Sequence, residues 1–179
     1  MRKLTEYVLA LTHLYGLVHK DKVMEIYTLQ NDEPINEDAI NAILRDGVNE
    51  GFVGTHGAYF VHETILENGS FDSQLAQRRG KPFYTPEQDE LLRYVDDYYY
   101  EKSHEFHALE EYAAERLFDG DRRQAENLAD DIQGVCQYAF SAQMVMATLN
   151  RRNVNFRNEQ QLSEVMQLIM ELANNTRLW

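Results

Sequence analysis

The sequence predicts a mostly α-helical protein in two parts, a winged-helix-like unit of three helices and a β-hairpin followed by a helical bundle. Apolar residues recur at the helical period of 3.6 in most segments, and residues 52–61 form two β-prone runs around a Gly-containing turn. Later segments begin with helix-capping residues. We therefore assign residues 1–65 to the winged-helix-like unit, 66–85 to a connector and 86–179 to the bundle.

The order of its elements predicts the first unit. A helix over about 4–15 is expected to end at Gly16, a second helix to begin with Asp21 as its N-cap, and a third to run from its cap Asn36 to Gly51. Three helices followed by a hairpin is the order of a winged helix-turn-helix. The alternative is a small helical domain with an incidental hairpin.

The remaining sequence predicts about four helices. Thr85 is expected to cap the first of them, a second covers about 103–118, and a third covers about 121–149. Asn158 and Gln161 form a capping-box pattern for the last helix.

Composition limits the classes of function. The 179 residues carry a net charge of −13, so the surface repels nucleic acids and anionic membranes at long range. The only cysteine, Cys136, excludes an internal disulfide, and no run approaches the ~20 apolar residues that span a bilayer. These features predict a cytoplasmic protein without membrane contact.

Two candidates for chemistry have simpler explanations. His104 and His107 share one face of a helix, with Glu110 or Glu111 one turn further on, but structural zinc needs about four ligands, so two exposed histidines are the favoured interpretation. Cys136 lies in an apolar helix, which predicts a buried and unreactive thiol. We expect no catalytic residue, no metal and no cofactor.

The third predicted helix is unsuited to DNA. Arg45 is its only basic residue, while four carboxylates share the helix, and the hairpin from Phe52 to His62 has no Lys or Arg. Because charge supplies most non-specific DNA affinity, this unit is expected to bind protein instead.

Two sets of residues are predicted contact surfaces. The first is an acidic and aromatic partner surface: Glu37, Asp38, Asp96, Asp97, Tyr99 and Tyr100. The second is a set of phosphate contacts that we interpret as the only basic cluster: Arg122, Arg123, Arg151, Arg152 and Arg157. Two pairs of this set would be separated by about 42 Å if one straight helix joined them.

Several segments resemble a known group of proteins. They are residues 11–16 (LTHLYG), 23–31 (VMEIYTLQN), 80–84 (GKPFY), 131–137 (DIQGVCQ) and 173–179 (ANNTRLW). The chain is similar in these to uncharacterised Firmicutes proteins that often carry a C-terminal SEC-C zinc motif. The resemblance implies a bacterial cytosolic protein and no established activity. The SEC-C cysteines are absent here, so no zinc role carries over.

These observations predict a non-enzymatic, intracellular protein–protein interaction module of a bacterium or a mobile element. One alternative is an acidic inhibitor that mimics DNA and occupies a host nucleic-acid-binding or defence protein. The other is a nucleic-acid-binding regulator that uses the C-terminal arginines. The partner and the oligomeric state are not determined by the sequence.

Overall fold

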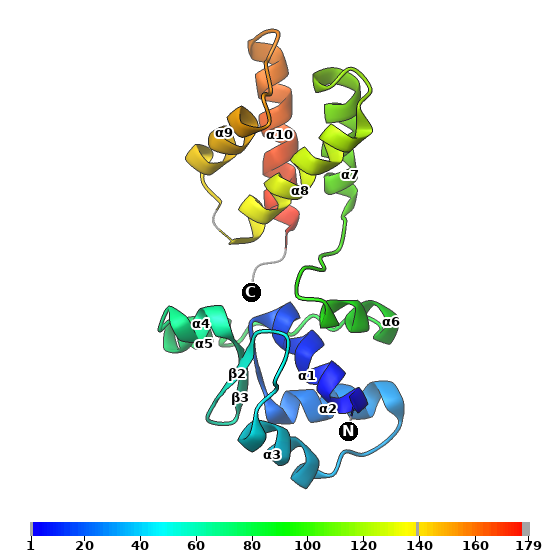
Figure 1. Ribbon diagram of the computed structural model, residues 1–179, viewed down its shortest axis with the longest axis vertical. Helices are drawn as coiled ribbons and strands as arrows, with labels where there is room; N and C mark the ends of the chain where they lie inside the picture. The colour runs from blue at the N-terminus through cyan, green and yellow to red at the C-terminus, as the bar shows by residue number, and fades with distance from the viewer. Residues whose placement is uncertain (1, 139, 177–179) are drawn as a thin grey trace. The chain divides into compact units, whose positions relative to one another are not determined.

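The computed structural model describes residues 2–138 and 140–176 and divides the chain into two compact units (Figure 1). The described residues up to Tyr100 form unit 1, and those from Glu101 onwards form unit 2. The protein is mostly helical, with a small antiparallel sheet in unit 1. The predicted boundary at residue 86 lies earlier than the division that the structure shows.

Unit 1 contains three helices and a three-stranded sheet, whose first strand lies between the first two helices and whose other two strands follow the third helix. Its elements are α1 (Arg2–Tyr15), β1 (Leu17–His19), α2 (Lys20–Asn31), α3 (Glu37–Asp46), β2 (Val53–His56), β3 (Tyr59–His62), α4 (Glu63–Glu67), α5 (Phe71–Arg78), α6 (Gln88–Leu91) and the 3-10 turn η1 (Leu92–Val95). The predicted hairpin is present as β2 and β3. The sequence did not predict β1, which pairs with β3 and gives the sheet order β1-β3-β2.

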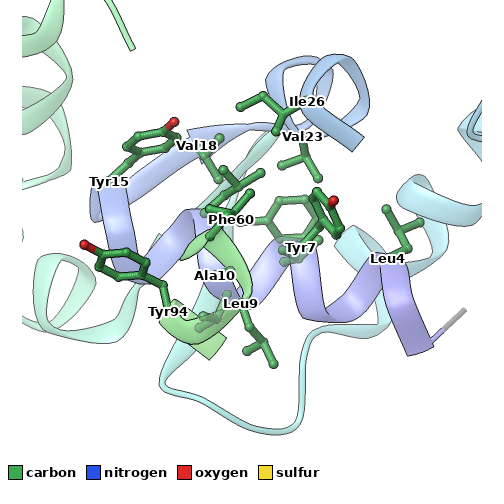
Figure 2. Packing of buried hydrophobic residues seen from close by; sticks show 14 of the residues in the cluster. Leu4, Tyr7, Leu9, Ala10, Tyr15, Val18, Val23, Ile26, Phe60 and Tyr94 are labelled. Atoms are coloured by element: carbon green, nitrogen blue, oxygen red, sulfur yellow. The ribbon is translucent and has the colours of Figure 1, made fainter. Parts of the chain in front are cut away.

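The core of unit 1 forms around α1. Tyr7 and Phe60 are completely buried at its centre, and Figure 2 shows both among side chains from α1, α2 and the sheet. The Tyr7 hydroxyl donates to the side chain of Gln30 at 2.9 Å, so the one polar atom of this ring is satisfied. The apolar stripe that predicted the first helix is therefore the stripe that the core buries.

Two helix ends differ from the prediction. The N-cap of α2 is His19, whose Nδ1 accepts from the amide of Asp21 at 3.2 Å, so Asp21 is not the cap. The third helix ends at Asp46, and Gly47 with φ +79° follows it, well before the predicted end at Gly51. Asn36 caps α3 as predicted, since its side chain accepts from the amide of Asp38.

Residues assigned to the connector and to the start of the bundle fold onto unit 1. The predicted connector contains the end of α4 and the whole of α5. The helix that was expected to start at Thr85 spans only Gln88–Leu91 before the 3-10 turn. Leu91 is 0% exposed and Tyr94 is 9% exposed, both within the α1 core, and this burial is the reason that these residues belong to unit 1.

Unit 2 consists of helices in its described part. They are α7 (His104–Tyr112), continued by the π-helical turn η2 (Ala113–Leu117), then α8 (Arg122–Tyr138), α9 (Ala142–Arg151) and α10 (Glu159–Asn175). The predicted helix over 121–149 is two helices, because Ser141 accepts from the amide of Met144 and starts α9. The predicted cap of the last helix is confirmed, since Asn158 accepts from the amide of Gln161 at 2.9 Å. Helix α7 packs against both α8 and α10.

Candidate functional site

A groove on unit 1 combines apolar and basic side chains, and we call it the Arg78 groove. It has a volume of about 350 Å³ and lies where β1, β3, the start of α2 and the end of α5 meet. Its apolar lining is Leu17, Tyr59, Leu75 and Phe83. Its polar lining is His19, Asp21, Lys22, Glu25, Arg78 and Arg79.

The floor of the groove follows from the alternation of side chains along β1 and β3. Val18 and Phe60 face the α1 core, so their neighbours face the opposite side of the sheet. On that side Leu17 forms a small buried cluster with Val61 and Ile65. Tyr59 and Leu75 pack against this cluster, and they are the apolar side chains that remain partly open at the groove.

Phe83 forms one wall and is 45% exposed. Its ring centroid lies 5.0 Å from that of Tyr15 in an edge-to-face arrangement. The ammonium group of Lys22 lies 5.0 Å from the Phe83 centroid, within the range of a cation–π interaction. The wall therefore presents an aromatic ring held in place by an aromatic and a cationic neighbour.

Arg78 is a half-buried cation with no anionic partner among the residues that the structure describes. Its Nη1 donates to the carbonyl oxygen of Gln74 at 2.7 Å, and its Nη2 donates to the carbonyl oxygen of Tyr15 at 2.9 Å. No carboxylate in the described part of the chain forms an ion pair with it. Burial lowers the pKa of the guanidinium from its usual value, and no neighbouring negative charge opposes this effect.

The other charges of the groove are unevenly paired. Lys22 contacts Glu25 at 2.7 Å, and Asp21 lies 3.4 Å from the ring of His19. Arg79 is exposed and, like Arg78, forms no ion pair with any described residue. The end of the groove at α5 therefore has unneutralised positive charge, whereas the side at α2 does not.

Sequence reasoning overlooked this basic set, although a signal was present. Residues 67–84 contain three Lys and Arg against two Asp and Glu, in a chain whose net charge is −13. The arginines after residue 120 are thus not the only basic cluster. Lys22 lies far from Arg78 in sequence, and only the fold brings it to the same groove.

The structure places the predicted acidic residues of α3 on its exposed face. Lys20 donates to Glu37 at 2.8 Å, and this contact lowers the pKa of Glu37 below its usual range. Lys20 also donates to Asn41 at 2.9 Å. Asp38 is exposed next to this pair. Half of the negative charge predicted here is therefore neutralised within unit 1.

Residues 96–100 do not form one continuous strip. The carboxylate of Asp97 points inward and lies 3.1 Å from His62 Nε2 and 3.8 Å from His13 Nε2. The hydroxyl of Tyr99 donates to Glu90 at 2.6 Å, and burial together with Glu90 raises the Tyr99 pKa. Asp96 remains exposed.

Tyr100 is half-buried. Tyr98, which was not among the predicted residues, is 81% exposed and is the most accessible ring of this segment.

Most of the predicted phosphate contacts are ion-paired. Asp131 accepts from Arg151 at 3.2 Å and from Arg152 at 2.6 Å, and Arg157 lies 3.8 Å from Asp119. The break between α8 and α9 allows the first contact, because one straight helix would carry Arg151 away from Asp131.

Arg122 and Arg123 stand exposed at the start of α8. They are the members of this set without an ion pair among the described residues.

The candidates for chemistry form no metal-binding group among the described residues. Cys136 is buried, as predicted, and burial raises its pKa to about 11. His107 contacts Glu110 at 3.2 Å on the surface of α7. In residues 2–138 and 140–176 no group of three or more His, Cys, Asp or Glu is arranged to hold a metal ion.

None of the helices in the described part of the chain has the length and apolar composition needed to cross a bilayer. Comparisons of the chain with protein-family models, curated proteins and solved structures find no match.

Proposed function

We propose that this chain is a non-enzymatic protein-binding module of the bacterial cytoplasm, and that unit 1 is a winged helix used to bind protein. The order α1-β1-α2-α3-β2-β3 and the sheet order β1-β3-β2 support the winged-helix assignment. In this assignment α2 and α3 form the helix-turn-helix, and the turn between β2 and β3 forms the wing.

The charge on the exposed face of α3 is the observation that favours a protein, rather than DNA, as the partner of unit 1. Arg45 is the only basic residue of α3, and it is already paired with Asp46 at 3.0 Å. Glu37 and Asp38 share the exposed face, and the strands β2 and β3 contain no Lys or Arg. A Lys or Arg that contacts a DNA phosphate raises the affinity by releasing counterions. The described residues on this face include no unpaired cation that could do so.

The balance of charge over the whole unit supports the same choice. Residues 1–100 contain nine Lys and Arg against seventeen Asp and Glu, a net charge of −8. A duplex lying across this surface would be repelled except at a few points.

The alternative function, binding of nucleic acid through the C-terminal arginines, has less support. Arg151 and Arg152 share the carboxylate of Asp131, so a phosphate would have to compete with an existing ion pair. The pairing also lowers the positive potential that would attract a distant phosphate. Arg122 and Arg123 alone provide two contacts, which is few for a nucleic-acid-binding surface.

Binding of labelled duplex and single-stranded DNA, measured by fluorescence anisotropy over a salt series, tests the negative part of this proposal. We expect no saturable binding near physiological salt, and no change in the Arg45→Glu variant. Saturable duplex binding that Arg45→Glu abolishes would show that unit 1 reads DNA and would overturn the proposal.

Photo-crosslinking tests the positive part. A benzophenone amino acid replaces Phe83 in the groove or, as a control, Leu29, which is 72% exposed on α2 and does not line the groove. In bacterial cells we expect crosslinked adducts from position 83 and none from position 29. We expect protease treatment to remove these adducts and nuclease treatment to leave them intact. Nuclease-sensitive adducts, or equal adducts from both positions, would contradict the proposal.

A further inference from the structure

We infer that the Arg78 groove binds an acidic peptide of a partner protein, with an aromatic or large aliphatic side chain on the apolar floor and a carboxylate beside Arg78 and Arg79. This inference rests on the proposed protein-binding function and specifies the chemistry of the partner. Four properties of the groove support it: a half-buried charge with no ion pair to a described residue, a second charge that is exposed, an apolar floor and the volume of the groove.

The uncompensated charge is that of Arg78. Removing a guanidinium from water is costly unless an anion or enough hydrogen-bond acceptors replace the water. Arg78 donates only to the neutral oxygens of Gln74 and Tyr15, and its Nε has no partner among the described residues. Among the described residues no buried polar side-chain atom lacks a partner, so this Nε is not fully buried and is accessible to solvent or to a ligand. A ligand carboxylate would supply the missing negative charge there.

Arg79 extends the positive end of the groove. It is exposed and forms no ion pair with a described residue, so it adds a second donor that is free to turn towards a ligand. Glu25 and Asp21 line the groove from α2, whereas Arg78 and Arg79 lie at the end of α5. This polarity favours one orientation of a bound segment, with its carboxylate at α5 and its uncharged part at α2.

The apolar floor distinguishes a peptide from a bare anion. Leu17, Tyr59, Leu75 and Phe83 contribute apolar surface that an inorganic phosphate cannot cover. The volume of about 350 Å³ is within the ~300–1,000 Å³ of pockets that hold small ligands, which is room for two or three side chains. A peptide with a large apolar side chain next to an acidic residue could cover the apolar floor and also place a carboxylate beside Arg78 and Arg79.

The surroundings disfavour a nucleic acid as the occupant. A nucleic acid carries a phosphate on every nucleotide and would extend beyond the groove onto a unit of net charge −8. A short peptide needs only one or two carboxylates, and both can lie at the α5 end. The net negative charge of unit 1 then disfavours the binding of anions elsewhere on this unit, which adds specificity for the groove.

Selection from a displayed library of random hexapeptides against the full chain tests the inference. We expect selected sequences to pair Asp or Glu with an aromatic or large aliphatic residue. Synthetic peptides from the selection, labelled with a fluorophore, are then measured by anisotropy against the wild type and two variants. Arg79→Glu reverses a groove charge, and Arg45→Glu makes the same change on α3 outside the groove.

We expect Arg79→Glu to weaken binding at least about tenfold and Arg45→Glu to change it less than about twofold. Replacing the peptide's acidic residues with Asn and Gln should weaken binding by a similar factor, and raising salt should weaken the acidic peptide more than the amide version. Arg79 is used because Arg78→Ala would also remove the bonds to Tyr15 and Gln74. A lower affinity from Arg78→Ala with unchanged circular dichroism would add support.

Three results would overturn the inference. Selected peptides without acidic residues would refute the chemistry, and equal binding to both charge-reversal variants would refute the location. Single-stranded DNA or inorganic phosphate that displaces the peptide at similar concentrations would show a general anion site. If one of these results is obtained but position 83 still crosslinks to protein, the inference about the acidic peptide fails and the proposed protein-binding function is retained. Nuclease-sensitive adducts would refute both the inference and the proposed function.

Discussion

Replacing Gly51 with alanine tests how closely the segment before β2 packs against α1. Gly51 has φ +73°, and a Cβ atom there would lie 2.5 Å from Leu9 Cδ2 and 3.3 Å from His13 Cε1. Leu9 is 4% exposed and His13 is 6% exposed, so both side chains lie in the packed interior of unit 1. The carbonyl oxygen of Gly51 also lies 2.5 Å from His13 Nε2, which ties this backbone to α1.

Two terms give the expected cost of Gly51→Ala. Alanine in the left-handed region costs roughly 1 kcal/mol, and displacing a packed core side chain costs roughly 1–3 kcal/mol. We therefore expect unit 1 to lose about 2–4 kcal/mol. Gly57 (φ +59°) and Gly47 (φ +79°) have no heavy atom within 4 Å of a built Cβ, so alanine at either position should cost only the first term.

Hydrogen exchange of the α1 amides, together with urea denaturation followed by circular dichroism, measures this difference. The exchange signal reports on unit 1 separately from unit 2. If Gly51→Ala is no more destabilising than Gly57→Ala, the close contact with Leu9 is absent and the reasoning fails. Gly51 would then be equivalent to a helix-terminating glycine, which is the role that the sequence predicted for it.

Two further predictions concern unit 2. Burial raises the pKa of Asp131, but its bonds to Arg152 and Arg151 outweigh this and hold the pKa below the usual range. The stabilisation is therefore present above the unfolded pKa of about 4 and is lost as pH falls through the folded pKa. Asp131→Asn should lower the free energy of unfolding at pH 7 and make this free energy less dependent on acid pH. Urea denaturation from pH 2 to 7 measures both effects, and an unchanged pH profile would contradict the pairing. The raised pKa of Cys136, about 11, leaves very little thiolate at neutral pH, so a thiol reagent should modify the native protein much more slowly than the urea-unfolded chain, and equal rates would refute its burial.

Local signals in the sequence predicted much of the secondary structure. The helical period was sufficient to predict α1, because the apolar side chains that define this period are the same ones that pack into the core. The caps Asn36 and Asn158 were predictable because each bonds to an amide two or three residues ahead, within the reach of local sequence. The hairpin followed from a short turn between two β-prone runs.

The elements that were missed depend on distant partners. Strand β1 has only three residues and exists because Leu17 and His19 pair with Val61 and Tyr59. The long helix expected from residue 86 is short because Leu91 and Tyr94 enter the α1 core instead of continuing a separate helix. A single-sequence pattern contains no information about such distant contacts.

The sequence determined the net charge, the absence of recognisable catalytic motifs and the excess of carboxylates over basic residues in α3, because these depend on which residues are present. Only the tertiary structure decided which charges are paired. In the folded chain Arg151 and Arg152 form ion pairs with Asp131, and the carboxylate of Asp97 lies next to His62. Arg78 lines the same groove as Phe83 and forms no ion pair with a described residue. The reason is physical: the energy of a charge depends on burial and on neighbours within a few ångströms, and folding sets both.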